Sequence, residues 1–128
     1  FKVIEIVDDR YLDYLELGVP TLIADNFFNS GAVIGDVIYD WKRLNFDKII
    51  GKTLINNKVV GKGRASFIMD SPLNAFKWYL DMCNKNRKKI NKGDIILLGS
   101  IVETKWLNTN DIVTIEIEEF NPLKIYVN

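Results

Sequence analysis

The sequence predicts an α+β fold in which β-strands dominate and one main helix stands out. Short runs of β-branched residues recur between turn-forming residues, and only one segment repeats its apolar residues at helical spacing. The 128 residues fit one domain, and 48% of them are hydrophobic, which is enough to offset the entropy of folding. We therefore expect residues 1–128 to form a single folded unit.

The first elements are two strands with a helical turn between them. The β-branched segment 2–8 is too short for a helix, and the apolar segment 32–34 lies between two glycines, so both favour strands. Pro20 permits a helical start, and Asn26 with Gly31 favours its end. One short helical turn is expected there.

A β-hairpin is predicted in the middle of the chain. The apolar runs 48–55 and 58–62 flank the pair Asn56 and Asn57. Because asparagine tolerates the positive φ of a tight hairpin turn, the two runs are expected to pair as antiparallel strands.

The main helix is expected to begin at Ser71 and to end before Gly93. Serine is a preferred N-cap, and Pro72 follows at the first helical position, where its missing N–H costs nothing. The basic residues of 85–89 suit a solvated helix C-terminus. The apolar residues that recur at helical spacing are Leu73, Phe76, Leu80 and Cys83. We expect the first three of them to be buried.

The last part of the chain is expected to form three more strands. Gly93 with Asp94 precedes the apolar run 95–98, and Asn110 with Asp111 precedes 112–115, so each pair predicts a turn that leads into a strand. The segment 123–127 supplies a final strand after a proline.

Charge and cysteine content exclude several classes of partner. Seventeen basic and seventeen acidic residues cancel, so we expect neither nucleic acid nor an anionic membrane as a partner. No run approaches the roughly eighteen apolar residues of a membrane span. Cys83 is the only cysteine, which excludes an internal disulfide and suits a cytoplasmic location.

Carboxylates are the side chains that remain for chemistry, because the chain has no histidine and no glycine-rich phosphate loop. Carboxylates suit hard cations such as Mg²⁺ or Mn²⁺. Glu5 lies in a strand whose two faces are largely apolar, so it is a candidate metal ligand, with an edge-strand or paired glutamate as the alternative. Glu116 and Glu118 share a polar strand face, which favours a solvated surface over a metal pair.

Four motifs span nearly the whole chain: IEIVDDR at 4–10, IADN at 23–26, SPLNA at 71–75 and GDIILLGS at 93–100. Together, and in this order, they resemble a known family, the 2-oxopent-4-enoate hydratases and 4-oxalocrotonate decarboxylases of the fumarylacetoacetate hydrolase superfamily. Phe27, Phe28 and Leu98 depart from the residues usual in that family.

The resemblance implies a β-rich mixed sheet or roll of the fumarylacetoacetate hydrolase C-terminal type. It implies a homo-oligomeric lyase that acts on a small unsaturated 2-oxo acid through a metal-stabilised enolate. Mg²⁺ or Mn²⁺ would be held by three carboxylates, the third at the position of Glu5 and the other two upstream. Since Phe1 lies just before that position, we expect 1–128 to be the C-terminal portion of one catalytic domain, inactive alone.

Asn26 and Ser100 are the candidate substrate-binding residues, because each follows a regular element within a shared motif. Their alternative roles are a helix C-cap for Asn26 and a turn hydroxyl for Ser100. Two other functions stay open. One is a non-catalytic remnant or binding module, and the other is a 2-keto-3-deoxy sugar acid dehydratase of the same superfamily.

Overall fold

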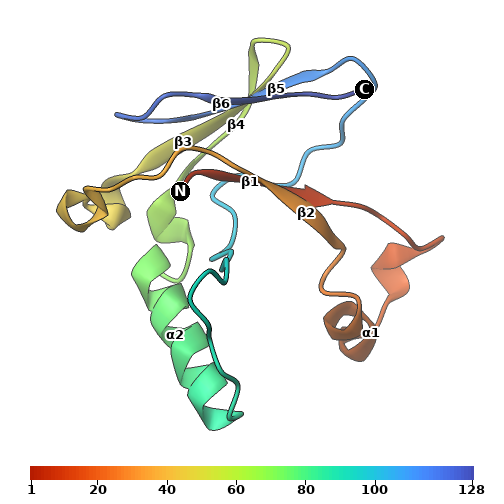
Figure 1. Cartoon of the computed structure of the whole chain (residues 1–128). Helices are drawn as coiled ribbons and strands as arrows, with labels where there is room; N and C mark the ends of the chain where they lie inside the picture. Colours follow the sequence, from red (N-terminus) through yellow and green to blue (C-terminus); the bar gives the residue numbers. More distant parts are fainter. The chain divides into compact units, whose positions relative to one another are not determined.

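The computed structural model describes every residue from 1 to 128, and the chain forms two compact units. The first unit spans Phe1–Val37 and the second spans Ile38–Asn128. Figure 1 shows a two-stranded sheet in the first unit and a larger sheet with the main helix in the second. The α+β class with dominant strands and one main helix is confirmed.

The first unit contains the predicted strands and the predicted helical turn. Its elements are β1 (Val3–Val7), the 3-10 turn η1 (Tyr14–Glu16), α1 (Val19–Ala24) and β2 (Asn29–Ile34). The two strands are antiparallel, with Glu5 opposite Ala32. Pro20 lies in the first turn of α1, where a missing N–H is tolerated, as the sequence predicts.

A β-bulge interrupts the pairing of β1 with β2. Ile6 lies opposite Gly31 and Val7 lies opposite Asn29, so Ser30 is an extra residue without a partner. Residues that lie opposite each other in antiparallel strands share a face, and residues two apart in one strand do as well. The bulge therefore places Asn29 on the face of β1 that carries Val7 and Glu5.

The turn between α1 and β2 is left-handed at three successive residues. Asn26, Phe27 and Phe28 have φ values of 59°, 51° and 64°. For residues other than glycine this conformation costs about 1–2 kcal/mol each, so packing must hold it. The ring of Phe28 meets Tyr11 and Tyr14 edge-on, with centroids 6.0 and 6.1 Å away.

The second unit is built on a four-stranded antiparallel sheet in the order β4-β3-β5-β6. Its strands are β3 (Ile50–Ile55), β4 (Lys58–Arg64), β5 (Ile112–Ile117) and β6 (Leu123–Tyr126), and its 3-10 turns are η2 (Trp41–Arg43), η3 (Phe46–Lys48) and η4 (Ala65–Phe67). Asn56 and Asn57 both have positive φ, which confirms the hairpin. All pairings in both sheets are antiparallel, which refines the expected mixed sheet.

The main helix, α2 (Pro72–Lys85), has the expected bounds but buries a different face. Its buried residues are Pro72, Ala75 and Cys83. The predicted burial of Leu73 and Phe76 is wrong, because they are 46% and 37% exposed, and Leu80 is only half-buried. The helix contacts η3, and its buried residues are small, whereas the larger Leu73 and Phe76 stay exposed.

The predicted strand at 95–98 is also wrong, because this segment pairs with no strand. The residues after it pack instead on glycines of β3 and β4. A Cβ at Gly51 or Gly63 would collide with Ile101, and one at Gly61 would collide with Val102. The three glycines thus let an irregular segment lie close against the sheet. None of the helices has the length and apolar character needed to cross a membrane.

Candidate functional site

Glu5 lies on β1 with an exposed side chain, which corrects the expectation that apolar neighbours enclose it. Its Oε1 accepts a hydrogen bond from Asn29 Nδ2 at 2.8 Å. The two residues are twenty-four positions apart in sequence and meet because the bulge turns Asn29 toward this face. Glu5 is therefore a surface carboxylate with one specific partner.

A second set of polar contacts fixes the left-handed turn beside β2. Asp25 Oδ2 accepts hydrogen bonds from Arg10 Nη2 and from the Phe28 backbone N–H, each at 2.9 Å. Its Oδ1 accepts the hydroxyl of Tyr11 at 3.2 Å. The Asp25 side chain is only 13% exposed, so these donors replace the water that the carboxylate loses.

Arg10 joins the two ends of this turn. Its guanidinium donates to the backbone carbonyl of Asp25 at 3.3 Å and to that of Asn29 at 3.4 Å. Asn29 is thereby held through its backbone by Arg10 while its side chain reaches Glu5. The contacts form one continuous path from the Asp25 carboxylate to the Glu5 carboxylate.

The pKa of Asp25 and that of Tyr11 move in opposite directions. Desolvation by itself raises the pKa of Asp25, but the hydrogen bonds from Arg10, the Phe28 N–H and Tyr11 outweigh it and hold that pKa below the usual range. Desolvation and the bond to the Asp25 carboxylate raise the pKa of the Tyr11 phenol. The turn is therefore organised around an ionised Asp25 and a neutral Tyr11 at neutral pH.

Ser100 takes the turn role that was its alternative, whereas the C-cap of α1 is Asp25 and not Asn26. Asn26 directly follows the C-cap of α1, with positive φ, and its backbone N–H donates to the Ile23 carbonyl. The Ser100 hydroxyl contacts the Val102 carbonyl and accepts the Val102 N–H, which is a serine turn. Asn26 lies in the first unit and Ser100 in the second, and substrate binding by either residue stays a prediction.

The chain by itself offers one candidate carboxylate ligand rather than a complete metal centre. No group of three histidine, cysteine, aspartate or glutamate side chains is close enough to hold an ion. At Glu5, however, Asn29 engages only Oε1, and Oε2 makes no hydrogen bond within the protein. An exposed carboxylate with a free oxygen fits the donor chemistry that Mg²⁺ and Mn²⁺ prefer. Glu5 can therefore supply one ligand.

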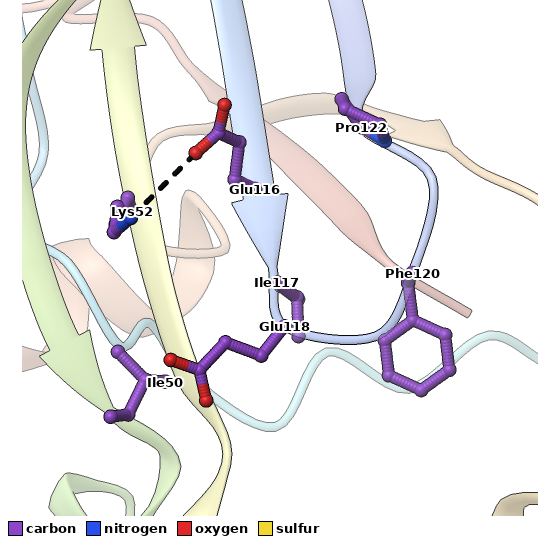
Figure 2. A pocket seen from close by; sticks show the side chains of 7 residues that line it. All are labelled: Ile50, Lys52, Glu116, Ile117, Glu118, Phe120 and Pro122. Atoms are coloured by element: carbon purple, nitrogen blue, oxygen red, sulfur yellow. Dashed lines mark ion pairs between the residues drawn. The ribbon is translucent and has the colours of Figure 1, made fainter.

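Glu116 and Glu118 lie instead beside a hollow in the second unit (Figure 2). The hollow has a volume of about 220 Å³ and is lined by Ile50, Lys52, Glu116, Ile117, Glu118, Phe120 and Pro122. Glu116 pairs with Lys52 at 3.9 Å, and both side chains are about two-fifths exposed. An ion pair this long and this solvated stabilises little. The geometry agrees with the predicted solvated strand face.

The chain is similar in sequence to two kinds of lyase, a decarboxylase and a hydratase. No family model matches. The chain is 26% identical over 121 residues to a 4-oxalocrotonate decarboxylase from Pseudomonas sp, and 26% identical over 115 residues to 2-keto-4-pentenoate hydratase 1 from Dechloromonas aromatica strain RCB. These matches cover 93% and 90% of the chain, but only 45% and 43% of the relatives. The predicted resemblance is confirmed. The chain spans somewhat less than half the length of the curated relatives it matches.

Solved structures show the same fold. The 4-oxalocrotonate decarboxylase from Pseudomonas putida G7 superposes on 98% of the chain with TM-scores of 0.85, in a complex with calcium and acetate, and 0.90, in a complex with magnesium and adipate. The sequence identity is 17% in both, and the chain covers 47% and 48% of those structures. The fold of the chain is that of this decarboxylase over the matched residues.

Sequence reasoning missed Asn29 and the pairing of Arg10 with Asp25. Arg10 and Asp25 each lie in a motif that carried the family resemblance, so their side chains were visible as a possible pair of opposite charges. Asn29 carried no such signal. Its role depends on an extra residue in β2, and the register of a two-stranded sheet is not readable from the pattern of Asn29–Ile34 alone.

Proposed function

We propose that residues 1–128 form the C-terminal portion of a metal-dependent lyase that acts on small unsaturated 2-oxo acids. By name, one curated relative is a decarboxylase of 4-oxalocrotonate and the other is a hydratase of 2-keto-4-pentenoate. The observation that carries the proposal is the free oxygen of Glu5, which the structure leaves exposed at the position where the resemblance expects a metal ligand.

Glu5 would hold Mg²⁺ or Mn²⁺ through this oxygen, together with carboxylates that are not part of the 128 residues. The bound cation would act as a Lewis acid that stabilises the negative charge developing on the 2-oxo oxygen as an enolate forms. That charge stabilisation serves hydration and decarboxylation equally, so the substrate rather than Glu5 separates the two reactions. Asn26 and Ser100 are the candidates for polar contacts with the substrate.

The proposal includes two properties of the whole protein. A homo-oligomer is supported by the many large apolar side chains at the surface, among them Trp41 at 48% and Trp106 at 73% exposure. A cytoplasmic location is supported by the single cysteine, Cys83, which is buried and unpaired. With one carboxylate ligand, the 128 residues alone are expected to lack activity.

The test is an activity assay on the natural gene product that contains these residues. 4-Oxalocrotonate and 2-keto-4-pentenoate are supplied separately, with Mg²⁺ varied from zero to saturation, beside a 2-keto-3-deoxy sugar acid. We expect turnover of one of the first two that requires the cation. Turnover of the sugar acid alone would favour the dehydratase. No turnover of any of the three, with the cation present, would favour a non-catalytic module.

A further inference from the structure

We propose that Asn29 is a positioning residue that fixes the orientation of the Glu5 carboxylate, and that the β-bulge at Ser30 exists to place it. This inference rests on the proposed function, because it takes Glu5 as a metal ligand. It adds a residue that no shared motif contains and that the sequence did not single out.

The bulge decides which face of the sheet Asn29 occupies. Glu5 lies opposite Ala32 and Ile6 opposite Gly31, so an uninterrupted register would place Ser30 opposite Val7 and Asn29 opposite Asp8. Asn29 would then point to the face away from Glu5. The extra residue shifts Asn29 to the position opposite Val7, which puts its amide on the Glu5 face, 2.8 Å from Oε1.

The chemistry of the contact fixes the direction of the hydrogen bond. An ionised carboxylate only accepts hydrogen bonds, so the Asn29 amide must present its NH₂ group to Glu5. The bond occupies Oε1 and restrains rotation of the carboxylate, while Oε2 stays available. A partner that orients a metal ligand in this way is typical of metal sites.

The backbone of Asn29 is itself held firmly. The Asn29 N–H donates to the Asn26 carbonyl at 3.1 Å, and the Asn29 carbonyl accepts from Arg10. Arg10 is fixed in turn by Asp25, whose other oxygen is held by Tyr11. Three left-handed residues between Asp25 and Asn29 persist because these contacts determine the turn from both ends. The position of Asn29 is therefore fixed by contacts within the protein that involve no ligand.

The first arm of the test needs no metal. In the natural gene product we compare the side-chain amide NMR signals of Asn29 with those of Asn86, whose amide donates to the Met82 carbonyl. Glu5→Ala removes the acceptor, so the Asn29 signals are expected to move while those of Asn86 stay. Asn29 signals that do not move would overturn the inference, since the contact would not exist in solution.

The second arm measures Mn²⁺ affinity by calorimetry in four proteins: unaltered, Glu5→Gln, Asn29→Ala and the control Asn45→Ala, which removes an exposed asparagine of the second unit. We expect Asn29→Ala to weaken binding about 10-fold, the lower end for partners that orient ligands, while Asn45→Ala matches the unaltered protein.

The outcomes separate the two proposals. Loss of binding in Glu5→Gln with unchanged affinity in Asn29→Ala would overturn the positioning role and leave the proposed function intact. An unaltered protein that binds no Mn²⁺, or a Glu5→Gln variant that binds equally well, would overturn the role of Glu5 and the positioning role with it.

Discussion

Each unit contains an aspartate whose carboxylate accepts several hydrogen bonds, but the residues that these bonds connect differ between the two units. In the second unit Asp111 accepts hydrogen bonds from Asn56 Nδ2 at 2.7 Å and from the Asn108 N–H at 2.8 Å. Asn56 Oδ1 in turn accepts the Ile112 N–H at 2.9 Å. The contacts begin and end within the sheet and its turns, and Asp111 is 9% exposed.

In the first unit the corresponding contacts lead outward. Asp25 holds Arg10, Arg10 holds the backbone of Asn29, and the Asn29 side chain ends on the exposed carboxylate of Glu5. The comparison teaches that a well-bonded aspartate is not by itself a functional signal. What distinguishes the first unit is that its contacts terminate in a carboxylate with a free oxygen at the surface.

The largest expected effect on stability is in the second unit, at Gly63. A Cβ there would overlap the backbone carbonyl of Ile101, which cannot move as a side chain can. Gly63→Ala is expected to lower the free energy of unfolding by about 1–3 kcal/mol, measured by chemical denaturation. The matched control is Gly31→Ala in β2, where a Cβ meets nothing within 4 Å. Equal stability of the two variants would show that the segment around Ile101 does not pack on the glycines.

A smaller and local effect is expected from Asp25→Ala. The substitution removes the acceptor for Arg10, Tyr11 and the Phe28 N–H, so the left-handed turn should open more often. Hydrogen exchange at Phe28 and Asn29 should accelerate roughly 10-fold, since net hydrogen bonds are worth about that factor each. Amides of β3 and β5 serve as the internal reference. A uniform acceleration in both units would contradict the local role.

Protonation of Asp25 and Asp111 should each contribute to a loss of folding stability at acid pH. Hydrogen bonds from Asn108 and Asn56 lower the pKa of Asp111, and the donors around Asp25 outweigh its desolvation and lower the pKa of Asp25. A lowered folded-state pKa gives stability that is complete above the unfolded value of 3.8 and is lost as the pH falls through the lower folded-state value.

Denaturant unfolding at pH 5 and at pH 3 measures this effect. The unaltered protein should lose stability between the two, whereas Asp25→Asn and Asp111→Asn should each lose less, because the group that takes up the proton is gone. The same loss in all three proteins would assign the acid sensitivity to other carboxylates.

The smallest expected effect concerns the surface. Trp106→Ser removes an indole that is 73% exposed and should leave the fold unchanged while weakening self-association. Light scattering of the natural gene product at micromolar concentration measures the mass with and without the substitution. A monomer before the substitution would contradict the homo-oligomer.

The sequence predicted those elements whose signals are local. Ser71 with Pro72 marked the start of α2, and Asn56 with Asn57 marked the hairpin, because caps and turns depend on residues adjacent in the chain. The segment 95–98 has the apolar pattern of a strand, yet it has no partner strand, and strand formation requires one.

Long-range packing was the part that local signals could not supply. Leu73 and Phe76 recur at helical spacing, but the side of α2 that is buried depends on its contact with η3. At the candidate site, Glu5 could be predicted because it is a carboxylate in an apolar strand. Asn29 could be identified only from the register of β2 in the structure. A one-residue shift in pairing changes the face of every side chain beyond it, and composition does not report that shift.

The central claim is that Glu5 is a metal ligand, and the most direct test compares metal binding with and without its charge. The natural gene product and its Glu5→Gln variant are titrated with Mg²⁺ and with Mn²⁺ by calorimetry, side by side. Because Glu5 is exposed, the variant should keep its stability within about 0.5 kcal/mol, so a loss of binding would report the ligand and not the fold. We predict that binding is lost in the variant, and equal affinity in the two proteins would contradict the account.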